Sequence, residues 1–202
     1  LKRIVTRPLL VLLKSYAIVY RDAAALMDRR ERTALRLALA GLAGALRQWE
    51  AADALSLREL ESIIDARTRS EYLAPAHAGL LGVTGLAVEA LGAARGHLLR
   101  RSGAASSRLH QLQEQQEAIV DRLEALRSDL GGGPEAPCTA YSHLSSPPVA
   151  RRALSLTAEA LRSEAELRCS LLATLGELTP SQQDEHRRLL IAWAERPFSS
   201  VE

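Results

Sequence analysis

Residues 109–130 read LHQLQEQQEAIVDRLEALRSDL, and apolar side chains recur in this stretch at alternating spacings of three and four. Polar residues fill nearly every position between them. This is the a/d pattern of a coiled-coil helix over about three heptads, and we expect it to pack against another helix. We call the recurring positions the seam; they are Leu109, Leu112, Gln116, Ile119, Leu123, Leu126 and Leu130.

Gln116 is the polar position of the seam. A polar residue there can set the register or the number of helices at a cost in stability, or the seam frays and Gln116 is solvated. The sequence leaves both interpretations open. Trp49 and Trp193 each lie near a predicted helix end. We expect them to pack in the core, with anchoring of a partner as the alternative.

The composition favours helices over sheets. Of 202 residues, 47% are hydrophobic and 25% are charged, which is ordinary for a soluble fold. Aromatic residues make up only 3%, whereas sheets need many aromatic and β-branched side chains. We therefore predict an all-α fold, an elongated antiparallel bundle of three long helical segments with coiled-coil packing, forming a single helical domain over residues 1–202.

The predicted segments are about 8–52, 56–130 with a break near 75, and 148–196, with a flexible loop at 131–147. Ser56 and Glu59 form a capping box that is typical of a helix start, and Pro75 interrupts the second segment.

The ends of the later segments carry their own signals. Gly131 opens a Gly-Gly-Gly-Pro run that predicts a helix stop. Thr179-Pro180 is typical of a helix start, so we expect a shorter last helix to begin there.

Basic residues are concentrated in two stretches. Residues 1–50 hold ten basic residues and four acidic ones, and the second stretch has no acid between Glu89 and Glu114. Such stretches either meet anionic lipid or nucleic acid, or they are solvated helix faces. The candidate basic surface of the second stretch comprises Arg95, Arg100, Arg101 and Arg108.

The sequence carries no motif of catalysis, cofactor binding or metal binding. Its histidines never lie three or four residues apart, and neither a phosphate-binding loop nor a Gly-x-Ser-x-Gly elbow is present. Cys138 and Cys169 have no metal-ligand spacing and are interpreted as reduced thiols in a cytoplasmic protein. The apolar run at residues 9–20 is too short to span a membrane. We therefore predict a protein that is not an enzyme, with no cofactor, metal or small-molecule substrate.

The outline of three long helical segments resembles the C-terminal BAR region of sorting nexins. Segments that carry this resemblance are Arg29-Arg30-Glu31, residues 42–50 (LAGALRQWE), Arg100-Arg101 and residues 189–195 (LLIAWAE). It implies a scaffold that dimerises and binds curved, anionic membranes in endosomal trafficking, peripheral to the endosomal membrane. The chain departs from the family in having only two lysines and in lacking basic residues in the loop after Leu130.

A second, shorter resemblance covers residues 141–202. Its pattern is an aromatic residue, a proline-bearing turn, a helix with Glu164 and Leu167, and Trp193 followed by Pro197-Phe198. This region is similar to the C-terminal region of cyclin-dependent-kinase-interacting helical adaptors. The resemblance implies a subunit of a multiprotein complex that associates with AAA ATPases in ribosome maturation or replication. In that case the seam and the segment from Trp193 to Phe198 bury against another subunit.

The two resemblances define the expected partners. We predict a protein partner or self-association, with an anionic membrane surface as the other class. Nucleic acid is not expected.

Overall fold

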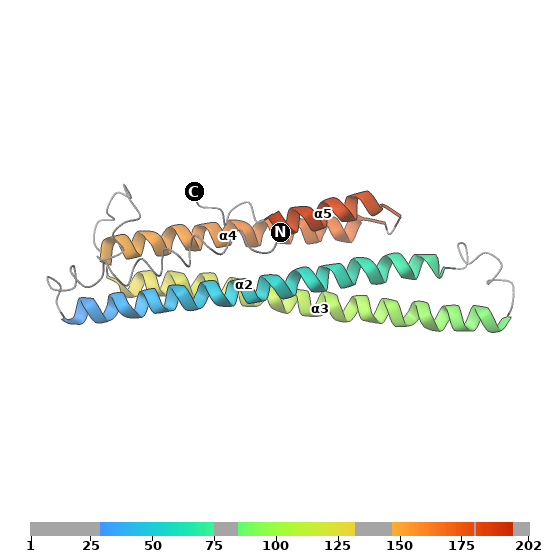
Figure 1. Cartoon of the computed structure of the whole chain (residues 1–202), viewed down its shortest axis with the longest axis horizontal. Helices are drawn as coiled ribbons and strands as arrows, with labels where there is room; N and C mark the ends of the chain where they lie inside the picture. The colour runs from blue at the N-terminus through green and yellow to red at the C-terminus, as the bar shows by residue number, and fades with distance from the viewer. Residues whose placement is uncertain (1–28, 75–84, 132–146, 180, 196–202) are drawn as a thin grey trace. The chain divides into compact units, whose positions relative to one another are not determined.

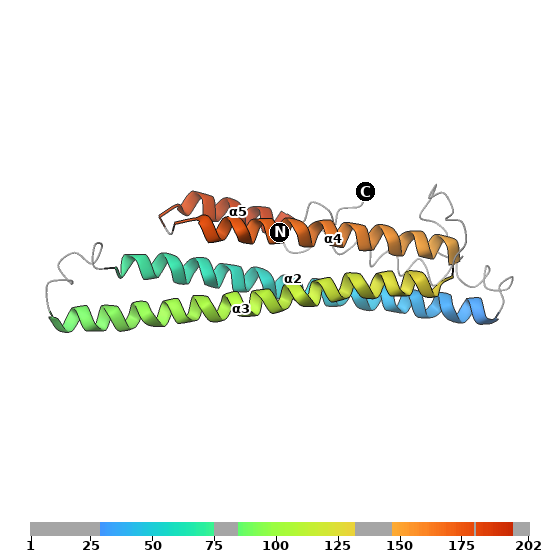
Figure 2. The same cartoon turned by 180° about the vertical axis from the view of Figure 1, so that it is seen from behind.

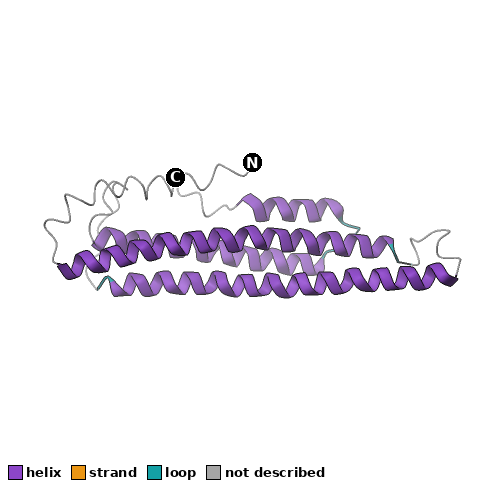
Figure 3. Cartoon of the chain, turned by 60° about the horizontal axis from the view of Figure 1, so that its bottom comes forward, coloured by secondary structure: helices purple, strands orange, loops and turns teal. Residues whose placement is uncertain are grey.

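The computed structural model describes residues 29–74, 85–131, 147–179 and 181–195, and in these residues helix is the only regular secondary structure (Figure 3). The described helices are α2 (Arg29–Tyr72), α3 (Gly85–Asp129), α4 (Pro147–Glu177) and α5 (Gln183–Glu195) (Figure 1). The predicted all-α fold class is therefore confirmed. The elongated three-segment bundle and its coiled-coil packing remain predictions.

α2 is continuous over 44 residues, so the predicted helix end near residue 52 and the new start at Ser56 are wrong. The Ser56 hydroxyl donates to the carbonyl of Ala52, one turn back, at 2.8 Å. Glu59 instead accepts hydrogen bonds from Arg108 on α3. A capping box forms only where the two side chains bond backbone N–H groups of a first turn. Here both are used elsewhere, and residues 50–56 contain no glycine or proline that would stop the helix.

The other helix ends follow from local chemistry. α2 ends at Tyr72, just before the predicted break at Pro75. α3 ends at Asp129, and Gly131 has a φ of 81°, the left-handed conformation that a glycine after a helix supplies. The last helix begins at Gln183, later than Thr179-Pro180 indicates. The N–H and the hydroxyl of Thr179 both donate to Oε1 of Gln182, at 2.8 and 2.9 Å.

Several predicted features lie outside the described residues. They are the predicted helix start at Pro8, the basic residues before Arg29, the loop at 132–146 with Cys138, and Phe198.

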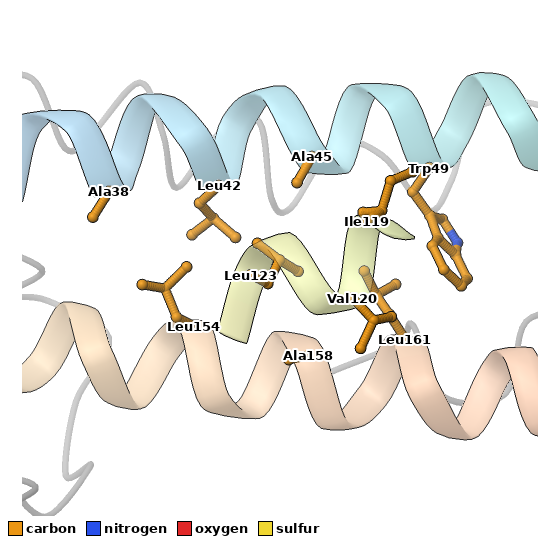
Figure 4. Close-up of a cluster of buried hydrophobic side chains, with 10 residues drawn as sticks. All are labelled: Ala38, Leu42, Ala45, Trp49, Ile119, Val120, Leu123, Leu154, Ala158 and Leu161. Atoms are coloured by element: carbon orange, nitrogen blue, oxygen red, sulfur yellow. The ribbon is translucent and has the colours of Figure 1, made fainter. Parts of the chain in front are cut away.

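The chain divides into two compact units, and α2, α3 and α4 each contribute to both. In the first unit the described residues are 29–50, 116–131 and 147–165. One apolar stripe from each helix meets in the middle of this unit (Figure 4). The buried residues are Ala38, Leu42, Ala45, Trp49, Ile119, Val120, Leu123, Leu154, Ala158 and Leu161.

Gly41 lets α2 approach α3 closely in this first unit. A Cβ atom placed on Gly41 would collide with Cδ1 of Leu126 and would lie 3.2 Å from its Cδ2. A Cβ atom on Gly44, one turn further, would meet nothing within 4 Å. Close approach therefore accounts for the glycine at 41 and not for the one at 44.

In the second unit the described residues are 51–74, 85–115, 166–179 and 181–195. α5 turns back along the last turns of α4, as both views show (Figures 1 and 2). α2 and α3 run antiparallel here, because Glu59 bonds Arg108 while Ser62 bonds Arg101. The core of this unit consists of Leu60, Ile63, Ala105, Leu109, Leu175, Leu189 and Trp193.

Candidate interaction surfaces and a buried ion pair

The predicted seam is buried by the chain's own helices. Leu109 lies in the core of the second unit, and Ile119 and Leu123 lie in the core of the first. Leu112 is also buried, whereas Leu126 and Leu130 are half-buried. This burial corrects the expectation that another subunit buries these residues.

Gln116 is only 1% exposed, so the interpretation in which it is solvated is wrong. Within the described residues its amide Nε2 has no hydrogen-bond acceptor. An unpaired buried amide donor costs free energy, so the side chain of Gln116 lowers the stability of the folded state.

Both tryptophans pack in the chain's own cores. Trp49 belongs to the core of the first unit and Trp193 to that of the second, where Trp193 is 1% exposed. The expected packing role is what the structure has. The alternative, in which Trp193 buries against another subunit, is wrong, because the chain's own helices already bury this side chain.

A buried ion pair lies beside Trp193 in the second unit. Nη2 of Arg168 on α4 bonds Oδ1 of Asp53 on α2, and both side chains are almost fully buried. Cζ of Arg168 lies 5.5 Å from the centroid of the Trp193 ring. The guanidinium thus meets a carboxylate and an aromatic face together, and removal of either charge would leave the other in a medium of low dielectric constant. This pair joins α2 to α4, and its guanidinium also faces the Trp193 ring of α5.

His186 is buried on α5 in the same unit. Burial lowers the pKa of its imidazole below the usual 6.5, and the nearby positive charge of Arg67 lowers this pKa further. Neither ring nitrogen has a hydrogen-bond partner among the described residues. His186 is therefore neutral at neutral pH and resists protonation.

A shallow groove of about 360 Å³ opens in the second unit between α2, α3 and α4. Its walls are mainly apolar, with Ile63, Leu109 and Leu172 among them, and Arg67 lies at its edge. Nη1 of Arg67 donates to the carbonyl of Leu175 at 2.9 Å. That bond satisfies a carbonyl in the last turn of α4, so Arg67 acts here as a helix cap.

The four predicted basic residues do not form one uniform surface. Nε and Nη2 of Arg108 donate to the two carboxylate oxygens of Glu59, at 2.9 and 2.8 Å, and this hydrogen bonding raises the Arg108 pKa. Nε of Arg101 donates to the Ser62 hydroxyl at 3.3 Å. Arg95 and Arg100 are exposed. Two of the four arginines therefore hold α3 against α2, and the other two face water.

The first half of α3 carries exposed apolar side chains that could not be recognised from the sequence, beside arginines that were identified there. Between residues 88 and 101 no side chain is buried, although the same helix is packed from Ser102 onward. Val88 is 48% exposed and Leu99 is 49% exposed. These apolar side chains lie on the same stretch of helix as the exposed Arg95, so the surface is apolar and basic.

The described residues contain neither a cluster of metal-ligating side chains nor a helix that could span a membrane. They hold no group of three or more histidine, cysteine or acidic side chains that could bind a metal ion. Among the described helices, none has both the length and the apolar character that crossing a lipid bilayer requires.

Comparisons with protein-family models, with curated proteins and with solved structures find no match to this chain.

Proposed function

We propose that this chain is a non-catalytic helical adaptor, a subunit of a larger complex that acts in the cytoplasm through protein–protein contacts. The observation that carries the proposal is the uncovered first half of α3. In the part of the chain that the structure describes, none of the fourteen helical residues 88–101 is buried, and only Leu91, Gly96 and Leu98 among them are half-buried. Helices are held in water mainly by the packing of an apolar face, so this stretch is suited to pack against a partner.

The charge and apolar content of this surface suit a protein partner. Exposed apolar side chains next to arginines are typical of interface centres, where arginine is enriched and lysine is depleted. The resemblance of residues 141–202 to helical adaptors suggests the class of complex, one built around AAA ATPases in ribosome maturation or replication. Within the proposal, the helices form an elongated antiparallel bundle with coiled-coil packing.

A BAR-like module that binds curved, anionic endosomal membranes is the second candidate. Its support is the long stretch of α3 without acidic residues, from 90 to 113. Each basic side chain at an anionic surface contributes about 1 kcal/mol. Because Arg101 and Arg108 already bond α2, the other two arginines of this stretch, Arg95 and Arg100, would supply only about 2 kcal/mol, which screening by salt reduces. We therefore place the adaptor first.

One pair of experiments separates the two candidates. The tagged full chain is purified from cells and its partners are quantified by mass spectrometry. The purified chain is also sedimented with phosphatidylcholine vesicles that contain or lack phosphatidylserine, at low and at physiological salt. The adaptor proposal expects stoichiometric protein partners and no vesicle binding at physiological salt. Vesicle binding that depends on phosphatidylserine, without stoichiometric partners, would overturn it in favour of the BAR-like module.

A further inference from the structure

The heptad spacing of the seam continues toward the start of α3, beyond the packed core. In the second unit, Ser102, Ala105, Leu109 and Leu112 are buried at spacings of three and four. The same spacing carried back along the helix reaches Leu98, Arg95, Leu91 and Val88. Leu98 and Leu91 are half-buried, whereas Arg95 and Val88 are exposed. We call these four residues the open seam.

α2 covers the open seam only in part. Ser62 bonds Arg101, and the two helices run antiparallel in this unit. Ten residues beyond Ser62, α2 ends at Tyr72, and ten residues back from Arg101, α3 has reached Leu91. The cover that α2 gives to α3 therefore stops near Leu91, which explains the exposure of Val88.

α4 does not reach the open seam. Gln113 bonds Cys169 and Leu109 packs in one cluster with Leu175, so α4 advances along α3 toward lower residue numbers. α4 ends at Glu177, two residues after Leu175, whereas Leu98 lies eleven residues before Leu109. α4 itself therefore ends before it reaches Leu98 and Leu91, while the turn into α5 reaches the end of α2, where Nε2 of Gln183 donates to the Tyr72 hydroxyl at 2.7 Å.

We propose that the open seam docks a helix of a partner protein, which continues past Leu98 the packing that α4 provides beside Leu109. This inference rests on the proposed adaptor function and names the surface that serves it. The docked helix carries apolar residues at spacings of three and four, because such a stripe is what fits an a/d seam. It carries an aspartate or glutamate where it faces Arg95, because an arginine enclosed in a helix interface needs a carboxylate.

The flanks of the open seam fit this occupant. Gly92 and Ala94 lie beside the seam and are small and exposed, and a Cβ atom on Gly92 would meet nothing within 4 Å. Small residues at the flanks let a second helix approach closely. A second copy of this chain fits less well, because residues 88–101 hold three arginines and one acid, and two such surfaces repel each other.

The test compares matched variants of the tagged full chain. Leu91→Glu places a charge in the open seam, and Ala93→Glu places the same charge on the outer face of the helix, two residues away. Arg95→Glu and Arg100→Glu form a second pair of the same kind. We expect Leu91→Glu and Arg95→Glu to lower partner recovery about ten- to a hundredfold, the effect of losing one buried anchor, while both controls retain it. Circular dichroism confirms that all four variants fold.

A photo-crosslinking residue placed at 91 or at 93 then identifies the contact. The proposal expects crosslinks from position 91 only, to a helical peptide of another protein that has the apolar spacing and a carboxylate. It is overturned if Leu91→Glu keeps the partners, if position 91 crosslinks to this same chain, or if the variants differ only in vesicle binding. A wild-type chain without stoichiometric partners overturns the adaptor function as well, so the two failures are distinguishable.

Discussion

Truncation of Leu123 is the most direct test of the first unit's core. Leu123 is fully buried between α2 and α4 (Figure 4). Leu123→Ala removes three carbon atoms from a site where Ala38, Ala45 and Ala158 are among the neighbouring core residues. Alanines cannot extend into the space left behind, so the cavity persists and adds to the lost transfer free energy. We expect a loss of about 3–5 kcal/mol in the free energy of unfolding, the upper part of the range for such truncations.

The matched control is Leu37→Ala, the same substitution in the same unit at a leucine that is 65% exposed. It should change the free energy of unfolding by no more than about 0.5 kcal/mol, because the surface site loses little buried area. Each unit has one tryptophan in its core, Trp49 in the first and Trp193 in the second. In a Trp193→Phe background, the fluorescence of Trp49 therefore reports on the unit that contains Leu123.

Urea titrations followed by Trp49 fluorescence and by circular dichroism give the midpoints for both variants. For a chain of this size the expected loss lowers the melting temperature by roughly 6–20 °C. Equal midpoints for Leu123→Ala and Leu37→Ala would refute the argument, since they would show that this stretch of α3 is not packed by its leucines.

Five further substitutions and a change of pH test other parts of the structure. Gly44→Ala should stabilise the chain by about 0.5–1 kcal/mol in thermal melts, because alanine is the better helix former and the new methyl meets open space. Gly41→Ala should gain less, because its methyl collides with a leucine of α3, and an equal gain would contradict this geometry. Arg168→Met should cost about 3–5 kcal/mol in urea titrations, since it leaves a buried carboxylate without its cation, and a cost typical of a surface ion pair would refute this. The folded state holds the pKa of His186 below 6.5, so the unfolded state binds more protons, and the urea midpoint should fall as pH drops below 6.5. His186→Phe should reduce that pH dependence, and an unchanged slope would show that His186 is not its source. Gln116→Leu should raise the melting temperature, because it removes an unpaired buried amide, and a lower one would show that this amide is paired in solution.

Helix content and the buried stripe of α3 could be predicted from spacing alone. Leucines that lie three and four residues apart define one face of a helix, whatever covers that face. Leu109 and Leu123 could therefore be predicted to pack, without any knowledge of the surface they pack against. The identity of the covering surface could not be predicted in this way. Spacing carries no information about whether a face meets another helix of the same chain or a separate subunit.

The predicted capping box at Ser56 failed for a specific reason. Its signal is local, a serine followed three residues later by a glutamate, and both side chains have competing partners once the chain folds. The Ser56 hydroxyl bonds back to Ala52, and Glu59 bonds Arg108, which lies 49 residues away in the sequence. A partner this distant is invisible to a four-residue motif. The buried pair of Asp53 and Arg168 was missed for the same reason.

The open seam, in contrast, was present in the sequence. Extending the spacing of 109–130 back by three heptads passes through Ala105 and Leu98 to Val88. Six glycines between residues 79 and 103 weaken a helix prediction in that region, because each one costs about 1 kcal/mol relative to alanine. Propensity and periodicity disagreed there, and the structure follows periodicity, with α3 helical from Gly85.

The arginines show why a count of basic residues could not assign a partner. Arg168 is buried and bonds the Asp53 carboxylate, so its charge is neutralised inside the second unit. Arg108 is partly exposed, yet Glu59 holds it in a bidentate pair, which leaves little of its charge for an external anion. Arg95 lies on the open seam between two half-buried leucines. A lipid surface needs several basic side chains acting together, whereas a partner helix needs only one carboxylate opposite Arg95. The distribution of carboxylates around the arginines is therefore consistent with the protein partner that we propose, although the charge of the stretch by itself suited a membrane equally well.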